Sequence, residues 1–200
     1  MMIRGDSGDY DLLEKWSKNF DCKGHHTCEL GVREGQGSKI IIDNVLNNYF
    51  HIGVDPYGDL KYKHFDNDEH FHWDHTVDGR PPTYPDSMRD QMIKDFADYT
   101  NRGKFHFVNT TDVDFMNSES YKRLSFSFVH FDGPHTTKEV LREAIWFADR
   151  SAEHTRFVFD DHIHYRMDII AHALTYWNFK TIESSTSKIC LEKYVRSNNS

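Results

Sequence analysis

The sequence predicts an α/β fold built on a mostly parallel sheet of about seven strands. Two observations carry this prediction. Short apolar runs alternate with helical patterns along the chain, and four of these runs end in a carboxylate or a glycine turn. The chain has 200 residues, of which 38% are hydrophobic and 28% charged, enough for one sizeable core. We find no internal repeat or linker, and therefore expect a single domain over residues 1–200.

Each element follows from its local pattern. The helix expected after the first strand, for example, carries Ile41, Ile42, Val45 and Leu46 on one side. The predicted strands are residues 27–32, 49–54, 104–108, 126–131, 157–159, 179–182 and 188–194. The predicted helices are residues 38–48, 87–101, 137–150 and 166–177, with a further helix at 10–20 that is available for contacts between copies of the chain.

Composition excludes several classes of partner. The net charge of −8 argues against nucleic acid, because phosphate binding needs clustered Lys and Arg. No apolar run approaches the roughly 20 residues that span a membrane, and no secretory signal is visible at the N-terminus. The three cysteines have no C-x-x-C spacing and are expected to be reduced thiols. We therefore expect a cytoplasmic protein without a nucleic-acid or membrane partner.

The turn after the first strand, from Glu29 to Ser38, contains glycines spaced G-x-x-x-G-x-G. Glycines let the backbone approach a ligand closely, but this spacing is not the G-x-G-x-x-G of dinucleotide sites. Asp55-Pro56 follows at the end of the next strand, where an acid can accept hydrogen bonds from ribose hydroxyls. The turn could also be only a tight connection, and Asp55-Pro56 only the end of a strand.

Further polar strand ends follow at Asp132-Gly133 and Asp160-Asp161. Ligands of open α/β sheets bind outside the carboxyl ends of the strands, so these side chains are expected to converge. With the glycine turn and Asp55, the set resembles the class I S-adenosylmethionine-dependent methyltransferases. The most similar subgroup contains the macrocin- and cephalosporin-type O-methyltransferases. The resemblance covers residues 27–194 and implies a Rossmann-like three-layer sandwich.

The resemblance also implies roles for individual residues. Glu29, Gly31 and Gly35 would line the methionine end of the cofactor, and Asp55 would hold its ribose. Thr110, Thr111 and Asp112 would lie near the adenine. The full set of expected cofactor contacts is Glu29, Gly31, Arg33, Gly35, Ser38, Asp55, Pro56, Thr110, Thr111, Asp112 and Asp132.

Asp132, Asp160 and Asp161 are candidate metal ligands, because members of that subgroup that use Mg²⁺ take carboxylates from these two strand ends. A hard cation prefers oxygen ligands and would help a bound hydroxyl lose its proton. The alternative is that Asp160-Asp161 only caps a strand and starts the next helix.

The sequence departs from the subgroup at Pro134, where macrocin-type enzymes often carry a second acid as general base. His135 and His162 are candidate catalytic bases in its place, because imidazole titrates near neutral pH. Either could instead be a surface histidine or a hydrogen-bond donor to substrate.

Residues 57–86 are rich in Asp, His, Gly and Pro and are expected to form an insertion. Within it, the string H-x-H-x-D-H at residues 70–75 matches the zinc motif of metallo-β-lactamase-like hydrolases. No strand precedes this string, however, and that fold has no counterpart of the glycine turn. A lid over the methyl acceptor is the preferred interpretation, with contacts from Tyr57, Tyr62, His72 and Trp73; incidental metal binding and a solvated loop are the others.

Together these features predict S-adenosylmethionine-dependent methylation of a hydroxyl on a small molecule, such as a sugar or a secondary metabolite, with assistance from Mg²⁺. A non-catalytic cofactor-binding protein, a zinc hydrolase and a nicotinamide-dependent oxidoreductase are the alternatives. The acceptor and the oligomeric state, a homo-oligomer included, stay open, because fold does not dictate substrate.

Overall fold

The computed structural model describes residues 8–58, 61–63, 65–67, 72–73 and 84–194. Within these residues, seven strands form a sheet in the order β5-β2-β1-β6-β7-β9-β8. All neighbouring pairs are parallel except those of β9, which runs antiparallel to β7 and β8. The mostly parallel sheet predicted from the sequence is confirmed. The strands are β1 His26–Leu30, β2 His51–Val54, β5 Phe105–Val108, β6 Phe126–Phe131, β7 Ser151–Phe159, β8 Phe179–Ser184 and β9 Ile189–Lys193.

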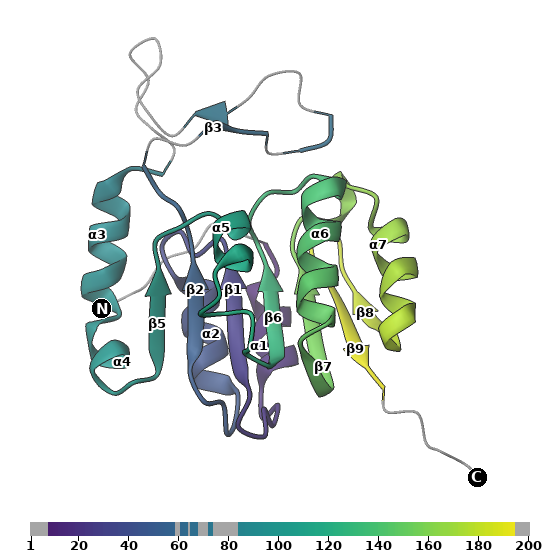
Figure 1. Cartoon of the computed structure of the whole chain (residues 1–200), viewed down its shortest axis with the longest axis horizontal. Coiled ribbons are helices and arrows are strands. Elements are labelled where there is room, and N and C mark those ends of the chain that lie inside the picture. Colours follow the sequence, from purple (N-terminus) through teal and green to yellow (C-terminus); the bar gives the residue numbers. More distant parts are fainter. Residues whose placement is uncertain (1–7, 59–60, 64, 68–71, 74–83, 195–200) are drawn as a thin grey trace.

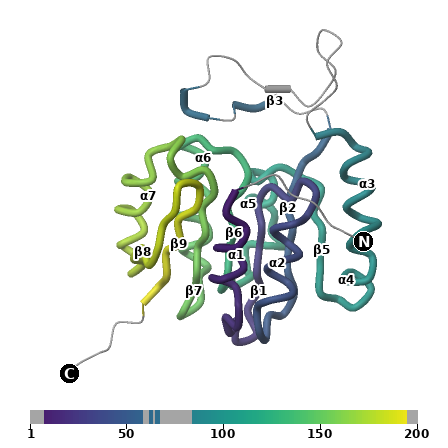
Figure 2. Tube along the Cα trace, turned by 180° about the vertical axis from the view of Figure 1, so that it is seen from behind, coloured from purple at the N-terminus to yellow at the C-terminus, as the bar shows by residue number. Residues whose placement is uncertain are grey.

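Helices cover both faces of the sheet, which gives three layers (Figures 1 and 2). One face carries α1 (Tyr10–Ser17) and α2 (Gln36–Asn44), which pack on each other. The other face carries α5 (Asp112–Asn117), α6 (Thr137–Ala148) and α7 (Met167–Leu174). The helices α3 (Asp86–Asp95) and α4 (Ala97–Asn101) lie beside the edge strand β5 (Figure 1).

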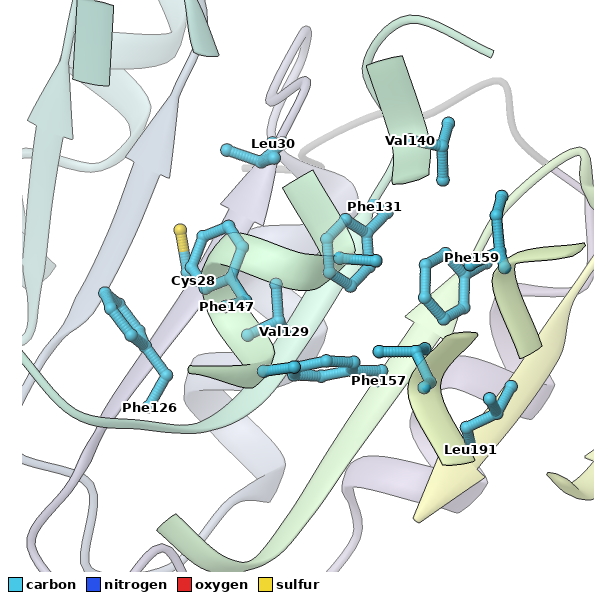
Figure 3. Packing of buried hydrophobic residues seen from close by; sticks show 14 of the residues in the cluster. Cys28, Leu30, Phe126, Val129, Phe131, Val140, Phe147, Phe157, Phe159 and Leu191 are labelled. Atoms are coloured by element: carbon cyan, nitrogen blue, oxygen red, sulfur yellow. The ribbon is translucent and has the colours of Figure 1, made fainter. Parts of the chain in front are cut away.

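The sheet separates the two larger clusters of the core, because successive side chains of a strand point to opposite faces, and a third cluster around Phe96 and Phe105 lies beside the edge strand. In β7, Phe157 and Phe159 join the cluster beneath α6 and α7, whereas Val158 joins the cluster beneath α1 and α2. The larger cluster is rich in phenylalanine, and Figure 3 shows how Phe131, Phe147 and Phe159 pack within it. These rings pack the central strands against α6, and this packing helps to determine where the carboxyl ends of the strands lie.

Several boundaries differ from the predicted ones. The predicted helix 87–101 is interrupted at Phe96, whose fully buried ring packs on Phe105 with centroids 4.5 Å apart. The predicted helix 166–177 ends in a 3-10 turn at Thr175–Trp177. Strand β7 begins at Ser151, earlier than predicted. Its first half is partly exposed and has no apolar pattern, so the sequence did not indicate it.

The insertion contributes a short antiparallel pair, β3 (Lys61–Tyr62) and β4 (His72–Trp73). Figure 1 shows β3 beyond the carboxyl ends of β1, β2 and β5. His70, Asp74 and His75 of the predicted zinc motif lie outside the described residues. No helix in the described part of the chain is both long and apolar enough to cross a membrane.

Candidate functional site

A cleft of about 440 Å³ opens at the carboxyl edge of the parallel strands, a volume typical of small-molecule sites. It lies where the strand order reverses between β1 and β6, the place where open α/β sheets bind ligands. Carboxylates dominate its charged lining. The lining includes residues 29–37, Asp55, Pro56, Tyr62, Lys63, Tyr84, Thr111, Asp112, Asp132, Gly133, Pro134, His135, Glu139, Asp160 and Asp161.

The glycine turn brings β1 against β6 at the floor of this cleft. Gly31 has φ +82°, and a Cβ there would lie 2.0 Å from the backbone oxygen of Asp132. Gly35 has φ +92°, precedes α2, and leaves room for the ring of Phe96. Both glycines are therefore required by close contacts within the protein. Of the two interpretations that the sequence left open, a ligand site and a tight connection, these contacts account for the second.

Asp55 lies at the end of β2 and faces the same turn. Its carboxylate accepts hydrogen bonds from the backbone N–H groups of Arg33 (2.9 Å) and Tyr57 (3.0 Å). Burial nevertheless raises the pKa of Asp55 to about 6, against the opposing effect of these hydrogen bonds. Asp55 is thus a buried acceptor held in one orientation beside the glycine turn.

The loop after β5 closes the cleft on the side of β2. Thr111 caps α5 by accepting a hydrogen bond from the backbone N–H of Asp114 (3.1 Å), which places Asp112 at the first turn of the helix. Asp112 is ion-paired with Arg142 of α6. Thr110 and Ser38, both expected cofactor contacts, are not among the lining residues that the described part of the chain supplies.

Glu29 begins a buried hydrogen-bond chain beneath the cleft. Its carboxylate accepts a hydrogen bond from the hydroxyl of Ser38 and lies 2.8 Å from Nδ1 of His130. Ser38 Oγ lies 3.0 Å from Nε2 of His51, whose Nδ1 lies 2.9 Å from Thr27 Oγ1. Burial lowers the pKa of His51 to about 3, so its ring is neutral.

The three predicted metal ligands do not lie in equivalent environments. Asp160 is 2% exposed, and its Oδ1 lies 2.8 Å from the Nζ atom of Lys188. Burial opposes the ionisation of Asp160, but the Lys188 ammonium and a hydrogen bond from Asp132 lower its pKa below the usual range. Burial and the charge of Asp160, to which Asp132 is hydrogen-bonded, raise the pKa of Asp132.

These observations do not fit a divalent cation held by the three aspartates. An ammonium group already pairs with Asp160, and Asp132 is directed to Asp160. The described residues do contain another close group of metal-binding side chains: Glu29, His130 and Asp132 each offer a ligand atom, all within 4.8 Å of one another. In that group, Glu29 and His130 already bond to each other.

His135 lies in the cleft and is 3% exposed. Its Nδ1 is 3.4 Å from Asp161 Oδ2 and its Nε2 is 3.8 Å from Asp132 Oδ1. The ring stacks between Phe65 and Tyr165, with centroids 5.7 Å and 6.2 Å away. The structure thus brings one predicted base into the cleft between two acids.

The other predicted base, His162, is placed differently. Its Nε2 donates a hydrogen bond to the backbone oxygen of Ser185 (2.9 Å), and it does not line the described cleft. His130 and Lys188 belong to the surroundings of the site as well, although neither was predicted from the sequence. The histidine stands in the run of residues 126–131, where Ser127 is the only other polar residue; this was a signal for a buried, hydrogen-bonded imidazole, whereas nothing marked Lys188.

The insertion reaches the cleft through Tyr62, Lys63 and Tyr84. Tyr57, an expected acceptor contact, is instead 5% exposed and donates its hydroxyl proton to the backbone oxygen of Arg33. For His72 and Trp73 only the backbone is described. Of the four residues predicted to act as lid contacts, Tyr62 is the one whose described side chain lines the cleft.

No family model matches the sequence, and no curated protein matches it. Solved structures do resemble the fold. A methyltransferase from Geobacter sulfurreducens has a TM-score of 0.57 at 8% identity, over 97% of this chain and 82% of that one. An O-methyltransferase from Bacillus cereus, in complex with S-adenosylhomocysteine, has a TM-score of 0.54 at 9% identity, over 92% and 77%. An rRNA methylase from Streptococcus thermophilus has a TM-score of 0.52 at 10% identity, over 93% and 94%. At these identities the likeness establishes the fold, a Rossmann-like α/β sandwich of the kind found in methyltransferases.

Proposed function

We propose that this chain binds S-adenosylmethionine in the cleft and transfers its methyl group to a hydroxyl of a small molecule. The observation that carries the proposal is the placement of Asp55, a buried acceptor beside the glycine turn at the switch point of the sheet. Structures with the same fold include methyltransferases in complex with S-adenosylhomocysteine.

The chemistry of the lining suits this cofactor. The cleft is rich in carboxylates, which favour a ligand carrying a sulfonium and an ammonium group over an anionic one. Asp55 would accept hydrogen bonds from the ribose hydroxyls, and Asp112 from the adenine amino group. Glu29, which also lines the cleft, would face the methionine part of the cofactor. When bound, S-adenosylmethionine would supply an electrophilic methyl group.

His135 is the proposed general base. It would accept the proton of the acceptor hydroxyl, while Asp161, 3.4 Å from its Nδ1, would orient the ring and stabilise the imidazolium. Tyr62 and Lys63 of the insertion would contact the acceptor. Macrocin-type O-methyltransferases often carry an acid as general base at the position of Pro134, and His135 would take over that role in this chain.

Calorimetric titration with S-adenosylhomocysteine tests cofactor binding directly. We expect one site per chain in the wild type. Asp55→Ala should weaken binding by about 10- to 100-fold, because a charged hydrogen-bond acceptor contributes about 1.5–3 kcal/mol. Asp98→Ala, a change of the same type at a carboxylate that is 77% exposed, is the matched control and should bind like the wild type. Absence of binding by the folded wild type would refute the proposal.

A panel of acceptors then tests the reaction. Hydroxyl-bearing small molecules should be methylated, whereas rRNA should not, because the chain carries a net charge of −8 and the cleft is acidic. Methylation of rRNA, as for the S. thermophilus relative, would overturn the assignment of the acceptor class but not of the cofactor. Cofactor binding without turnover on any acceptor would instead support a non-catalytic cofactor-binding protein.

A further inference from the structure

Lys188 is a fully buried lysine just before β9, on the face of the sheet that α1 covers. Its Nζ atom lies 2.8 Å from Asp160 Oδ1 and 3.5 Å from His130 Nε2, and 5.5 Å from the ring centre of Tyr10. A buried ammonium is stable only when paired and hydrogen-bonded, and these contacts meet that requirement. Lys188 is therefore a fixed charge behind the carboxyl edge of the sheet.

The turn before β9 holds this side chain in place. The hydroxyl of Ser185 accepts a hydrogen bond from the backbone N–H of Lys188 (2.9 Å), and the backbone N–H of Ser185 donates to the Lys188 oxygen (2.7 Å). The hydroxyls of Ser185 and Ser187 both donate to the carboxylate of Asp9, just before α1. With its turn bonded on both sides and its side chain buried, Lys188 cannot leave the acids by rotating into solvent.

The two acids of this strand-end pair, Asp132 and Asp160, are hydrogen-bonded to each other. Asp132 also lines the cleft, on the side of His135. Two carboxyl groups so close together need a counter-charge, which in many proteins is a divalent cation. Here Lys188 supplies that charge from within the chain.

We propose that the Lys188 ammonium takes the place of a divalent metal ion at the Asp132–Asp160 pair, so that the protein works without Mg²⁺. Lys188 is then a positioning residue. By donating to His130 Nε2, it fixes the ring with its proton on Nδ1, and this proton is donated to Glu29. The charge of Lys188 thereby orients the carboxylate at the methionine end of the cleft. This second role rests on the proposed function, whereas the replacement of the metal does not.

Binding of Mn²⁺, followed by electron paramagnetic resonance and calorimetry, tests the proposal without any turnover. The wild type should show no stoichiometric binding of Mn²⁺ at neutral pH. Lys188→Ala should gain a site, because it leaves two carboxyl groups facing a space without a cation. The double variant Lys188→Ala/Asp160→Asn should lose that site again. Lys15→Ala, which removes an exposed lysine paired with Glu183, is the matched control and should behave like the wild type.

Two outcomes would overturn the proposal. The first is one-to-one binding of Mn²⁺ by the wild type that Asp160→Asn abolishes. The second is a folded Lys188→Ala that gains no ion, since Lys188 would then not be what takes the ion's place. Should Lys188→Ala not fold by circular dichroism, Lys188→Met retains most of the side-chain volume and carries the same test. Should that variant fail too, the wild type and Asp160→Asn decide alone.

The same proteins separate this inference from the proposed function. Titration with S-adenosylhomocysteine reports on the cofactor, and Mn²⁺ reports on the acids. A wild type that binds neither ligand refutes the cofactor and supports the replacement of the metal. A wild type that binds both, with Mn²⁺ lost in Asp160→Asn, retains the cofactor and refutes the role of Lys188. If turnover is found, it should persist in the presence of EDTA.

Discussion

At the scale of single residues, the buried carboxyl group of Asp55 has two roles, one in the fold and one in the proposed function. It holds the backbone of the glycine turn through Arg33 and the chain after β2 through Tyr57, and in the proposed function it also binds ribose. Because burial raises its pKa to about 6, the folded state holds an extra proton between about pH 4 and pH 6. Asp55 therefore makes the protein less stable as the pH rises through this range.

Asp55→Asn removes this titration and nearly preserves the shape of the side chain. We expect the unfolding free energy of the variant, relative to the wild type, to rise by about 2–3 kcal/mol between pH 4 and pH 7. Urea denaturation of both proteins at both pH values measures this difference. The contributions of the other buried acids cancel, because they are present in the variant and in the wild type. Asp98→Asn, at an exposed carboxylate, is the matched control. An equal pH profile for Asp55→Asn and wild type would contradict the raised pKa of Asp55.

His135 is the second residue whose role can be isolated. His135→Gln should lower kcat by about 10²- to 10⁴-fold, as expected for loss of a general base, while affinity for S-adenosylhomocysteine changes little. His172→Gln, at an exposed position on α7, serves as the control. Unchanged turnover by His135→Gln on an acceptor found in the panel would remove the residue from the mechanism.

At the scale of elements, the junction between β1 and α2 depends on the absence of a side chain at Gly31. Gly31→Ala must adopt a positive φ and overlap the backbone of Asp132, so we expect a loss of about 2–5 kcal/mol. Gly24→Ala has an equally positive φ of +81° but no neighbour within 4 Å, and should lose only about 1–2 kcal/mol. Thermal unfolding of both variants compares them. Equal losses would show that the contact with β6 does not constrain the turn.

The elements themselves were largely predictable from hydrophobic periodicity. The boundaries predicted for β6, residues 126–131, are those observed, because every side chain of that strand is buried. The short helix α5 was missed, since its six residues are too few to show a helical repeat. The break at Phe96 was missed as well, because it depends on packing against Phe105, a contact that local sequence does not reveal.

At the scale of the whole molecule, the insertion is attached to the α6 side of the cleft. The carboxylate of Asp66 accepts hydrogen bonds from the backbone N–H (3.0 Å) and the hydroxyl of Thr137, at the start of α6. Phe65 packs on His135 and on His164, whose ring centre is 4.5 Å away. The insertion thus contacts both the helix that follows His135 and the proposed base itself.

Asp66→Ala should release this attachment. We expect a higher KM for the acceptor and faster cleavage by protease within residues 57–86, with little change in affinity for S-adenosylhomocysteine. The cost in stability should be about 1 kcal/mol, the usual value for a side chain that caps a helix start. Asp90→Ala, at an exposed carboxylate of α3, provides the comparison. A KM equal to that of the wild type would argue against the role of the insertion as a lid.

The site residues that lie at the ends of parallel strands were predictable from their order in the sequence. The residues that reach the site by packing from a distant part of the chain were not. Glu29, Asp55, Asp132 and His135 all lie at strand ends or just after them, and strand ends of a parallel sheet meet at one edge. Lys188 reaches the site from the antiparallel hairpin, behind the sheet. No spacing rule relates its position in the sequence to that of Asp160.

The position of Lys188 has a consequence for the order in which the protein acquires its charges. A ribosome delivers Asp132 and Asp160 before the hairpin that carries their counter-charge, and it delivers Asp9, which bonds the turn before β9, earlier than either of them. Until β9 docks between β7 and β8, Asp160 lacks the Lys188 ammonium, and water must solvate its carboxylate instead. The cleft is therefore completed only after β9 has been synthesised, when this strand and the segment around Asp9 come together beside the same pair of aspartates.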